Sequence, residues 1–279
     1  MTRIGLGLLG ALWMLLASPS MAQQVEFADI PTPAPGPAQS IGTYTNGCFT
    51  GGEMLPIDGA GYQVIRISRN RNWGHPALID FLEDLGQSVA REGLGVALVA
   101  DMNQPMGGPI TGHASHELGL DADIWLRLDL PRLSANAREQ LGAITMVDTS
   151  TNDWRVTDDF TLRQAELIRL AASDPRVGRI FVHPAIKQAM CEIDWPDRSF
   201  LQTVRPWYGH DSHMHVRINC PANNPQCRLQ SPPPAGDGCG AELQSWFPDP
   251  NRPPPPPAGP RPPPPPLPAG CLALLGQYR

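Results

Sequence analysis

Two short histidine-rich segments constrain how this chain can fold more than any other feature of its sequence. The first spans residues 112–123 and reads GHASHELGLDAD, and the second spans residues 210–215 and reads HDSHMH. They hold five of the seven histidines, although about ninety residues separate them. Neutral imidazole is the commonest protein ligand for zinc, and two histidines with one carboxylate leave the open coordination position typical of hydrolytic zinc sites. The sequence therefore predicts a fold that joins the two segments around one Zn²⁺ ion.

The first 22 residues have the composition of an export signal. Arg3 precedes an apolar run over residues 4–16, and Ser20-Met21-Ala22 offers small residues for cleavage. This run is shorter than the ~20 apolar residues that a membrane span needs, and no later segment is long and apolar enough to cross a bilayer. We therefore expect a signal peptide over residues 1–22 and an exported protein without a transmembrane segment.

Six cysteines follow this segment and agree with export, because disulfides persist in oxidising compartments. They contain no CxxC pair and are Cys48, Cys191, Cys220, Cys227, Cys239 and Cys271. Many pairings are open to six cysteines, and only Cys220 and Cys227 are close enough in sequence to suggest a local loop. The formal net charge of −6, without a cluster of lysine or arginine, argues against nucleic acid as a partner.

The spacing of apolar residues predicts helices and strands in irregular order. Helices are expected over residues 76–93, 160–173 and 184–191. Strands are expected over residues 94–100, 120–128, 179–182 and 214–218. The second of these strands alternates, so Asp121 and Asp123 share one face. This mixture indicates an α+β fold with a central antiparallel sheet, flanked by helices and by long loops that disulfides pin.

A proline-rich stretch separates the end of the chain from its main domain over residues 23–250. Between Pro253 and Pro268, twelve of sixteen residues are proline, which favours an extended polyproline II rod without a core of its own. Cys271 and an apolar run lie beyond the rod, so we expect the tail over residues 251–279 to return and be stapled to the domain. A disordered tail is the alternative.

Two familiar catalytic motifs are absent. Residues 116–120 do not form an HExxH zinc helix, because Leu120 stands where the second histidine is required, and no G-x-S-x-G serine motif occurs. His116 and Asp123 are too far apart for one helical face, but their spacing suits a loop that enters a strand. His213 and His215 alternate, so they share one face of a strand.

These residues carry a resemblance to known families. His116-x6-Asp123 followed by His213-x-His215 is similar to the zinc pattern of lysostaphin-type peptidases, D-Ala-D-Ala metallopeptidases and hedgehog signalling domains. Eight wider segments resemble the penicillin-insensitive murein endopeptidase family over nearly the whole mature chain: residues 40–42, 44–48, 74–76, 113–116, 181–188, 204–207, 213–217 and 236–247. The domain over residues 23–250 is then expected to be a zinc metallopeptidase domain.

The resemblance implies roles for individual residues. His116, Asp123 and His215 match the three zinc ligands, and His113 matches a histidine of the same site that is a further candidate for metal contact. His213 matches a general base or oxyanion stabiliser, with His210 close by as a second catalytic candidate. A possible second metal site of the family falls on residues 146–153. These residues match the family pattern poorly, so the resemblance does not decide whether a second zinc ion binds.

The resemblance also implies an activity and a location. The family hydrolyses the D-alanyl–meso-diaminopimelyl cross-link between peptidoglycan stem peptides in the periplasm, and this chain is expected to do so with a zinc-activated water. It further implies the disulfides Cys48–Cys271, Cys191–Cys239 and Cys220–Cys227. A carboxypeptidase that removes terminal D-alanine and a non-catalytic zinc-containing wall-binding protein are the alternatives. The spare histidines His210 and His213 favour an enzyme, since a structural zinc needs no base.

Several other residues have two interpretations. Glu117 and Asp121 are alternative bases, although orienting roles beside the ligands are favoured. His75 and His183 are interpreted as structural histidines, the former as a helix cap or core residue. Four further side chains are candidates for contact with substrate, the arginines through its carboxylates and the aromatic residues as a wall: Arg205, Arg217, Trp207 and Tyr208.

Overall fold

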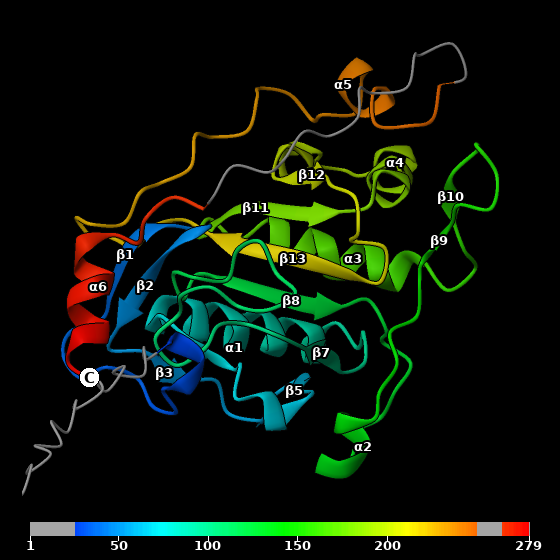
Figure 1. Cartoon of the computed structure of the whole chain (residues 1–279). Helices are drawn as coiled ribbons and strands as arrows, with labels where there is room; N and C mark the ends of the chain where they lie inside the picture. The colour runs from blue at the N-terminus through cyan, green and yellow to red at the C-terminus, as the bar shows by residue number, and fades with distance from the viewer. Residues whose placement is uncertain (1–25, 250–263, 279) are drawn as a thin grey trace, which may run out of the picture.

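The computed structural model describes residues 26–249 and 264–278 and is built around a seven-stranded sheet (Figure 1). In spatial order its strands are β12 (Val204–Pro206), β11 (Val177–Val182), β13 (His213–Ile218), β8 (Asp121–Trp125), β7 (Ala97–Val99), β5 (Tyr62–Val64) and β4 (Asp58–Gly59). The four middle strands, β11, β13, β8 and β7, pair antiparallel, whereas β12 and β5 each add a parallel neighbour. The predicted α+β fold with a central, mainly antiparallel sheet is confirmed.

Short hairpins and single turns complete the strands. The remaining strands are β1 (Gln39–Thr43), β2 (Asn46–Thr50), β3 (Glu53–Met54), β6 (Trp73–Gly74), β9 (Val147–Asp148) and β10 (Arg155–Val156). The 3-10 turns are η1 (Phe27–Asp29), η2 (Ile67–Arg69) and η3 (Ser199–Gln202). The strand predicted over residues 94–100 begins only at Ala97, because Gly95 adopts a φ of 115° and interrupts the extended backbone.

Two histidine–proline pairs start helices. The helices are α1 (Pro76–Arg91), α2 (Ala135–Glu139), α3 (Leu162–Ala172), α4 (Pro184–Glu192), α5 (Ala241–Gln244) and α6 (Ala269–Gly276). Before α1, His75 Nδ1 accepts a hydrogen bond from the backbone N–H of Ala77, and before α4, His183 Nδ1 accepts from Ala185. Each cap satisfies a free amide of the first turn, so the structural interpretation of both histidines is confirmed. None of the helices in the described ranges has the length and apolarity needed to cross a membrane.

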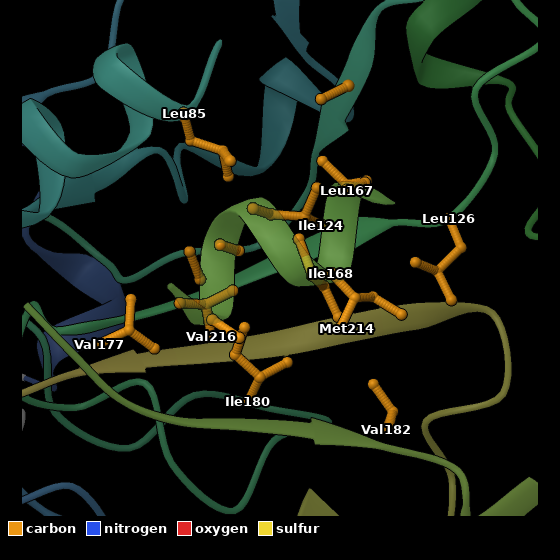
Figure 2. Close-up of a cluster of buried hydrophobic side chains, with 14 of the residues drawn as sticks. Leu85, Ile124, Leu126, Leu167, Ile168, Val177, Ile180, Val182, Met214 and Val216 are labelled. Atoms are coloured by element: carbon orange, nitrogen blue, oxygen red, sulfur yellow. The ribbon is translucent and has the colours of Figure 1, made fainter. Parts of the chain in front are cut away.

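The hydrophobic core lies between one face of the sheet and the helices α1 and α3. Alternate residues of three neighbouring strands point into it: Ala122 and Ile124 on β8, Met214 and Val216 on β13, and Ile180 and Val182 on β11. Figure 2 shows Ile124, Met214 and Val216 of this set meeting Leu167 and Ile168 of α3, with Leu85 of α1 nearby. Because strand side chains alternate, the residues between these positions must point to the opposite face.

That opposite face of β8 and β13 is polar. In the antiparallel register, His215 lies opposite Asp123 and Arg217 lies opposite Asp121. All four side chains are buried. The core therefore holds in place two strands that display ionisable groups, since any slip by one residue would exchange the two faces.

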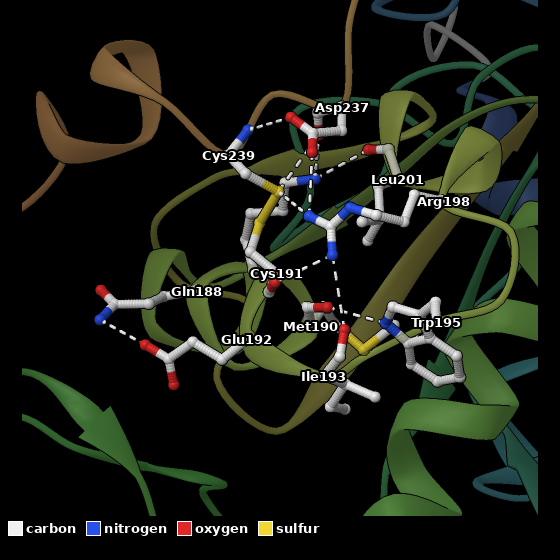
Figure 3. Close-up of a disulfide and its surroundings, with 11 residues drawn as sticks. Gln188, Met190, Cys191, Glu192, Ile193, Trp195, Arg198, Leu201, Asp237 and Cys239 are labelled. Carbon is white, nitrogen blue, oxygen red and sulfur yellow. Dashed lines mark hydrogen bonds and ion pairs between the residues drawn. A yellow bond between two sulfur atoms is a disulfide. The ribbon is translucent and has the colours of Figure 1, made fainter.

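Three disulfides tie the surrounding loops together, and all three implied pairings are confirmed. Cys48 of β2 bonds Cys271 of α6, which staples the end of the chain to the domain as expected. Cys220 bonds Cys227 directly after β13. Cys191 at the end of α4 bonds Cys239 (Figure 3).

A half-buried arginine, Arg198, also holds the loop beside the Cys191–Cys239 bond. Arg198 donates to the backbone oxygens of Cys191 and Ile193 and to the carboxylate of Asp237 (Figure 3). These bonds link the start of η3 to the chain on both sides of the disulfide. The signal peptide predicted over residues 1–22 and most of the proline-rich rod lie outside the described residues.

Candidate metal centre

The first histidine segment is a loop that runs from β7 into β8. His116 is fully buried and adopts a left-handed backbone with a φ of 71°, which is uncommon for a residue other than glycine. Its backbone N–H donates to Asp121 Oδ2 at 3.2 Å. Ser40 Oγ donates to the carbonyl of Leu118, so the β1–β2 hairpin supports the same loop. Contacts on both sides thus hold His116 in a strained conformation, a pattern that clusters at functional sites.

His116 and His215 each have one ring nitrogen turned outward to an acceptor. His116 Nδ1 donates to the carbonyl oxygen of Met102 at 2.6 Å, and His215 Nε2 donates to Asp121 Oδ1 at 2.8 Å. A carbonyl or carboxylate oxygen only accepts, so the proton of each neutral ring sits on the outer nitrogen. The inner nitrogens, His116 Nε2 and His215 Nδ1, are left with lone pairs.

His113 is oriented in the same way. Its Nε2 lies 3.0 Å from Asp101 Oδ2, which also accepts from Arg69 and Arg71 at 2.8 Å each. Burial raises the pKa of Asp101, but the hydrogen bonds from His113, Arg71 and Arg69 outweigh it and lower the pKa well below its usual range. Asp101 is therefore an ionised acceptor, and His113 Nδ1 carries the inward lone pair.

The three inner nitrogens converge on Asp123. Its Oδ1 lies 3.1 Å from His215 Nδ1 and 3.4 Å from His116 Nε2, and its Oδ2 lies 3.5 Å from His113 Nδ1. Candidate ligand atoms of His113, His116 and Asp123 all lie within 4.8 Å of one another. Within the described part of the chain, the buried atoms His116 Nε2 and Asp123 Oδ1 have no hydrogen-bond partner. Lone pairs that face a carboxylate repel it unless a cation lies between them, so these residues fit a metal ion.

The charges of the site also favour a cation. Burial lowers the pKa of His215, but Asp121 and Asp123 outweigh it and raise the pKa to about 9, so without a metal ion the inner nitrogen holds a proton, a positive charge that a bound cation would replace. Burial raises the pKa of Asp123, yet His116 and His213 hold it well below its usual range. The buried carboxylates thus remain ionised and attract positive charge to the point where the rings meet.

His213 and His210 lie beside this cluster. His213 Nε2 is 3.7 Å from Asp123 Oδ2, and His210 Nδ1 donates to the carbonyl of Tyr208 at 2.9 Å, which leaves His210 Nε2 with a lone pair. Burial, together with the neighbouring His213 and His215, lowers the pKa of His210 to about 4. Burial also lowers the pKa of His213. Both imidazoles are therefore neutral at pH 7 and able to accept a proton.

Glu117 and Asp121 are placed to orient other groups. Asp121 is fully buried, and its Oδ1 accepts from His215 and from Arg217 Nε at 2.8 Å each. Glu117 accepts from the backbone N–H of Gly47, and burial raises its pKa to about 7. Neither carboxylate lines the cavity at the cluster. The geometry therefore favours the orienting interpretation of both over that of a base.

A cavity of about 350 Å³ opens onto the cluster and provides room for a ligand. Phe181 and Trp207 line it, with ring centroids 5.7 Å apart, and the Trp207 side chain is 53 % exposed. Tyr208 instead packs against Trp246, at 4.9 Å between ring centroids, and does not line the cavity. The aromatic wall expected beside the second histidine segment thus consists of Trp207 with Phe181.

Comparison with known proteins assigns the family. A family model described as penicillin-insensitive murein endopeptidase matches residues 40–276 of this chain. The chain belongs to that family. A protein of that name from Klebsiella pneumoniae (strain 342) is 45% identical over 269 residues, which cover 96% of this chain and 97% of the relative. One from Haemophilus influenzae (strain ATCC 51907 / DSM 11121 / KW20 / Rd) is 48% identical over 240 residues, 82% of each chain, and one from Escherichia coli (strain K12) is 45% identical over 271 residues, 96% and 97% of the two chains.

Two supports of the candidate metal centre carry no signal in the sequence. Asp101 and Met102 lie shortly after the end of strand β7, and neither belongs to a histidine-rich segment. The outer nitrogens of His113 and His116 nevertheless bind them. Only the position of the loop over the end of β7 could have revealed the pairing.

The two arginines expected to meet substrate carboxylates are engaged with other groups of the protein. Arg205 is paired with Glu242, and Arg217 is paired with Asp121 and donates to Gln230 Oε1 at 3.0 Å. Both are buried. That expectation is therefore not supported for either side chain, because each charge already has a partner.

The segment matched to a possible second metal site forms the β9–β10 hairpin. Val147 and Asp148 pair with Val156 and Arg155 in it. Apart from His113, His116 and Asp123, no group of three His, Cys, Asp or Glu side chains in residues 26–249 and 264–278 brings its ligand atoms equally close. The described residues therefore offer one candidate metal site.

Proposed function

We propose that this protein is a zinc-dependent murein endopeptidase that hydrolyses the D-alanyl–meso-diaminopimelyl cross-link between peptidoglycan stem peptides. The observation that carries the proposal is the convergence of three histidine lone pairs on Asp123 at the floor of a cavity. Its relatives named penicillin-insensitive murein endopeptidase, similar over nearly the whole chain, supply the reaction class.

The residues proposed to hold the zinc ion are His116, Asp123 and His215, with His113 as a further ligand. Imidazole and carboxylate are ligands that zinc accepts, and their outer atoms are fixed by acceptors that orient the rings. Bound zinc supplies a Lewis acid that polarises the scissile carbonyl and lowers the pKa of water. We assign no second metal ion.

His213 and His210 are the proposed proton-transfer residues. Both are neutral at pH 7, and His213 Nε2 lies closest to the proposed metal ligands, 3.7 Å from Asp123 Oδ2. His213 accepts the proton of the attacking water and returns it to the leaving amine, or donates a hydrogen bond to the developing oxyanion. Trp207 and Phe181 form a wall that orients the peptide and excludes water.

The protein is proposed to act in the periplasm. Residues 1–22 are proposed as a removable signal peptide, residues 23–250 as the zinc metallopeptidase domain, and residues 251–279 as a tail that Cys271 staples back. The three disulfides support this location, because such bonds persist outside the reducing cytosol.

Mass spectrometry of purified cross-linked muropeptide dimers after incubation with the protein tests the proposal. We expect monomers that carry an intact D-alanine at the new carboxyl end, complete loss of cleavage after chelation, and recovery with Zn²⁺. Penicillin is expected to leave activity unchanged, because it acylates a serine nucleophile and this site uses none.

Other products would favour the alternatives. Release of free D-alanine from pentapeptide stems without cleavage of dimers would identify a carboxypeptidase. Binding of zinc and peptidoglycan without any cleavage would identify a wall-binding protein. Full activity in metal-free protein, or inactivation by covalent penicillin labelling, would contradict the zinc mechanism.

A further inference from the structure

A second cavity shares part of its wall with the cavity at the metal centre. The second has a volume of about 340 Å³ and runs beside Tyr44, Asn219 and residues 229–233. Both cavities are lined by Arg179, Arg217 and Gln230. The wall between the two cavities therefore carries two arginine side chains.

Arg179 and Arg217 form a pair of like charges across neighbouring strands. They lie opposite one another in the β11–β13 register, on the polar face of the sheet. Like charges in this position are destabilising unless other groups compensate them. Arg217 is compensated, since its Nε donates to Asp121 Oδ1 at 2.8 Å and its guanidinium lies 4.3 Å from the centroid of the Tyr44 ring.

Arg179 has no such compensation. Its Nη2 donates to the backbone carbonyl of Ser231, and no carboxylate in residues 26–249 or 264–278 forms an ion pair with it. Burial, followed by the charges of Arg205 and Arg217, lowers its pKa. The guanidinium is half-buried in the shared wall of two cavities. Glu242 acts on Arg179 only through longer-range attraction. The guanidinium therefore has donors to spare for direct pairing with the carboxylate of a ligand.

The position of Arg179 relative to the metal centre suits one particular carboxylate. Phe181 lies opposite His215, and Arg179 is two residues from Phe181 on the same face of β11. Two strand residues advance the chain by roughly 6.6 Å, so the guanidinium is within about one amino acid of the ligands. In a D-alanyl–diaminopimelyl cross-link, the carbon that bears the scissile nitrogen also bears a free carboxylate.

We propose that Arg179 binds the carboxylate adjacent to the scissile nitrogen and thereby positions the diaminopimelyl side of the cross-link. This inference rests on the proposed endopeptidase function and adds the residue that selects a charged leaving group. Arg217 is held by its ion pair with Asp121 and supports the subsite, but it is not the residue that recognises the ligand. The guanidinium fork matches a carboxylate with two parallel hydrogen bonds.

The test assays zinc-loaded enzyme on two dimeric substrates that differ only in the charge of one group. Muropeptide dimers with this carboxylate free, and the same dimers with it converted to a carboxamide, are given to wild-type protein, Arg179→Gln and Arg179→Lys. Wild type is expected to cleave the free acid with a kcat/KM roughly 10–100-fold higher, the usual worth of a hydrogen bond to a charged group. In Arg179→Gln this preference disappears, because the rate falls only on the free acid, and Arg179→Lys retains part of it.

Arg155→Gln is the matched control. Arg155 is exposed and lies outside both cavities, and its substitution removes the same charge. It should keep the wild-type preference. Arg179→Gln with an unchanged preference, or with equal losses on both dimers, would overturn the inference, because a merely structural arginine affects both substrates alike. Wild-type protein that cleaves neither dimer would instead contradict the endopeptidase function, and the inference with it.

Discussion

The two faces of β8 and β13 differ in composition and in what covers them. One face presents Ile124 and Met214 to helices α1 and α3, which bury it in the main core. The other presents Asp123, His213 and His215 to a cavity. The same two short strands thus supply both the stability of the sheet and the proposed chemistry, because successive side chains point in opposite directions.

Different interactions hold the segments that cover the two faces. The helices hold the apolar face by burying apolar surface, which needs no particular atom-to-atom geometry. The loops around the polar face are held by directional contacts, such as the hydrogen bond from Gly47 to Glu117, and by disulfides at Cys48–Cys271 and Cys220–Cys227. The residues that stabilise the sheet and the residues of the candidate site are therefore different ones on the same two strands.

The largest expected effect comes from the polar face. His215→Ala should lose both bound zinc and activity, because it removes a proposed ligand. His213→Ala should keep about one zinc per chain while the rate falls by ~10²–10⁴, the usual worth of a proton-transfer group or an oxyanion donor. Metal analysis of the purified variants and muropeptide assays measure both quantities.

These two variants also distinguish ligand from base. Equal zinc loss in both would mean that His213 is a ligand rather than a proton-transfer residue. Near-normal turnover in His213→Ala would transfer the role to His210, which lies in the same cavity with a free Nε2.

A smaller effect is expected from Met214, the residue between those two histidines, whose side chain lies on the apolar face. Met214 is fully buried, so Met214→Ala should lower the free energy of unfolding by ~2–5 kcal/mol through lost burial and a cavity. Zinc content and activity per folded molecule should stay near wild type, because the side chain points away from the site. Urea unfolding of zinc-loaded proteins, with activity measured well below the transition, tests both statements. A loss of activity as large as that of His213→Ala would show that the two faces are coupled.

The smallest effect concerns the loops around the polar face. Replacing Cys48 and Cys271 together by serine removes a cross-link between residues 223 apart, and it should destabilise the protein by about 2–4 kcal/mol. The matched Cys220→Ser/Cys227→Ser variant opens a loop closed across a separation of only 7, so a smaller loss is expected. Thermal melting of both zinc-loaded variants measures the difference. An equal or reversed order would show that chain entropy in the unfolded state is not what these bonds contribute.

Particular residues show why some features were predictable. The alternation at residues 121–125 and the pair His213 and His215 assigned each side chain to a face, because a strand has a period of two. His75 and His183 were predictable as structural residues, since each precedes a proline that starts a helix. The disulfide pairing was expected only through the family resemblance, because six cysteines leave many pairings open.

Other features had no local signal. Arg205 and Arg217 were expected to face substrate, but each has a carboxylate partner, Glu242 and Asp121 respectively. Arg179 was not singled out, although it is the arginine that lines both cavities without such a partner. A sequence shows that a residue is charged, whereas the partner of that charge depends on which strands are neighbours.

By itself, the sequence determined the secondary structure of the central strands and the set of histidines and carboxylates available for a metal centre. Tertiary structure decided which nitrogen of each ring faces inward. Asp101, Met102 and Asp121 hold the outer nitrogens of His113, His116 and His215, and these acceptors lie 12, 14 and 94 residues from their histidines. The physical reason is that hydrogen bonds depend on distance in space and not along the chain, so the orientation of the proposed ligands exists only once β7, β8 and β13 have paired.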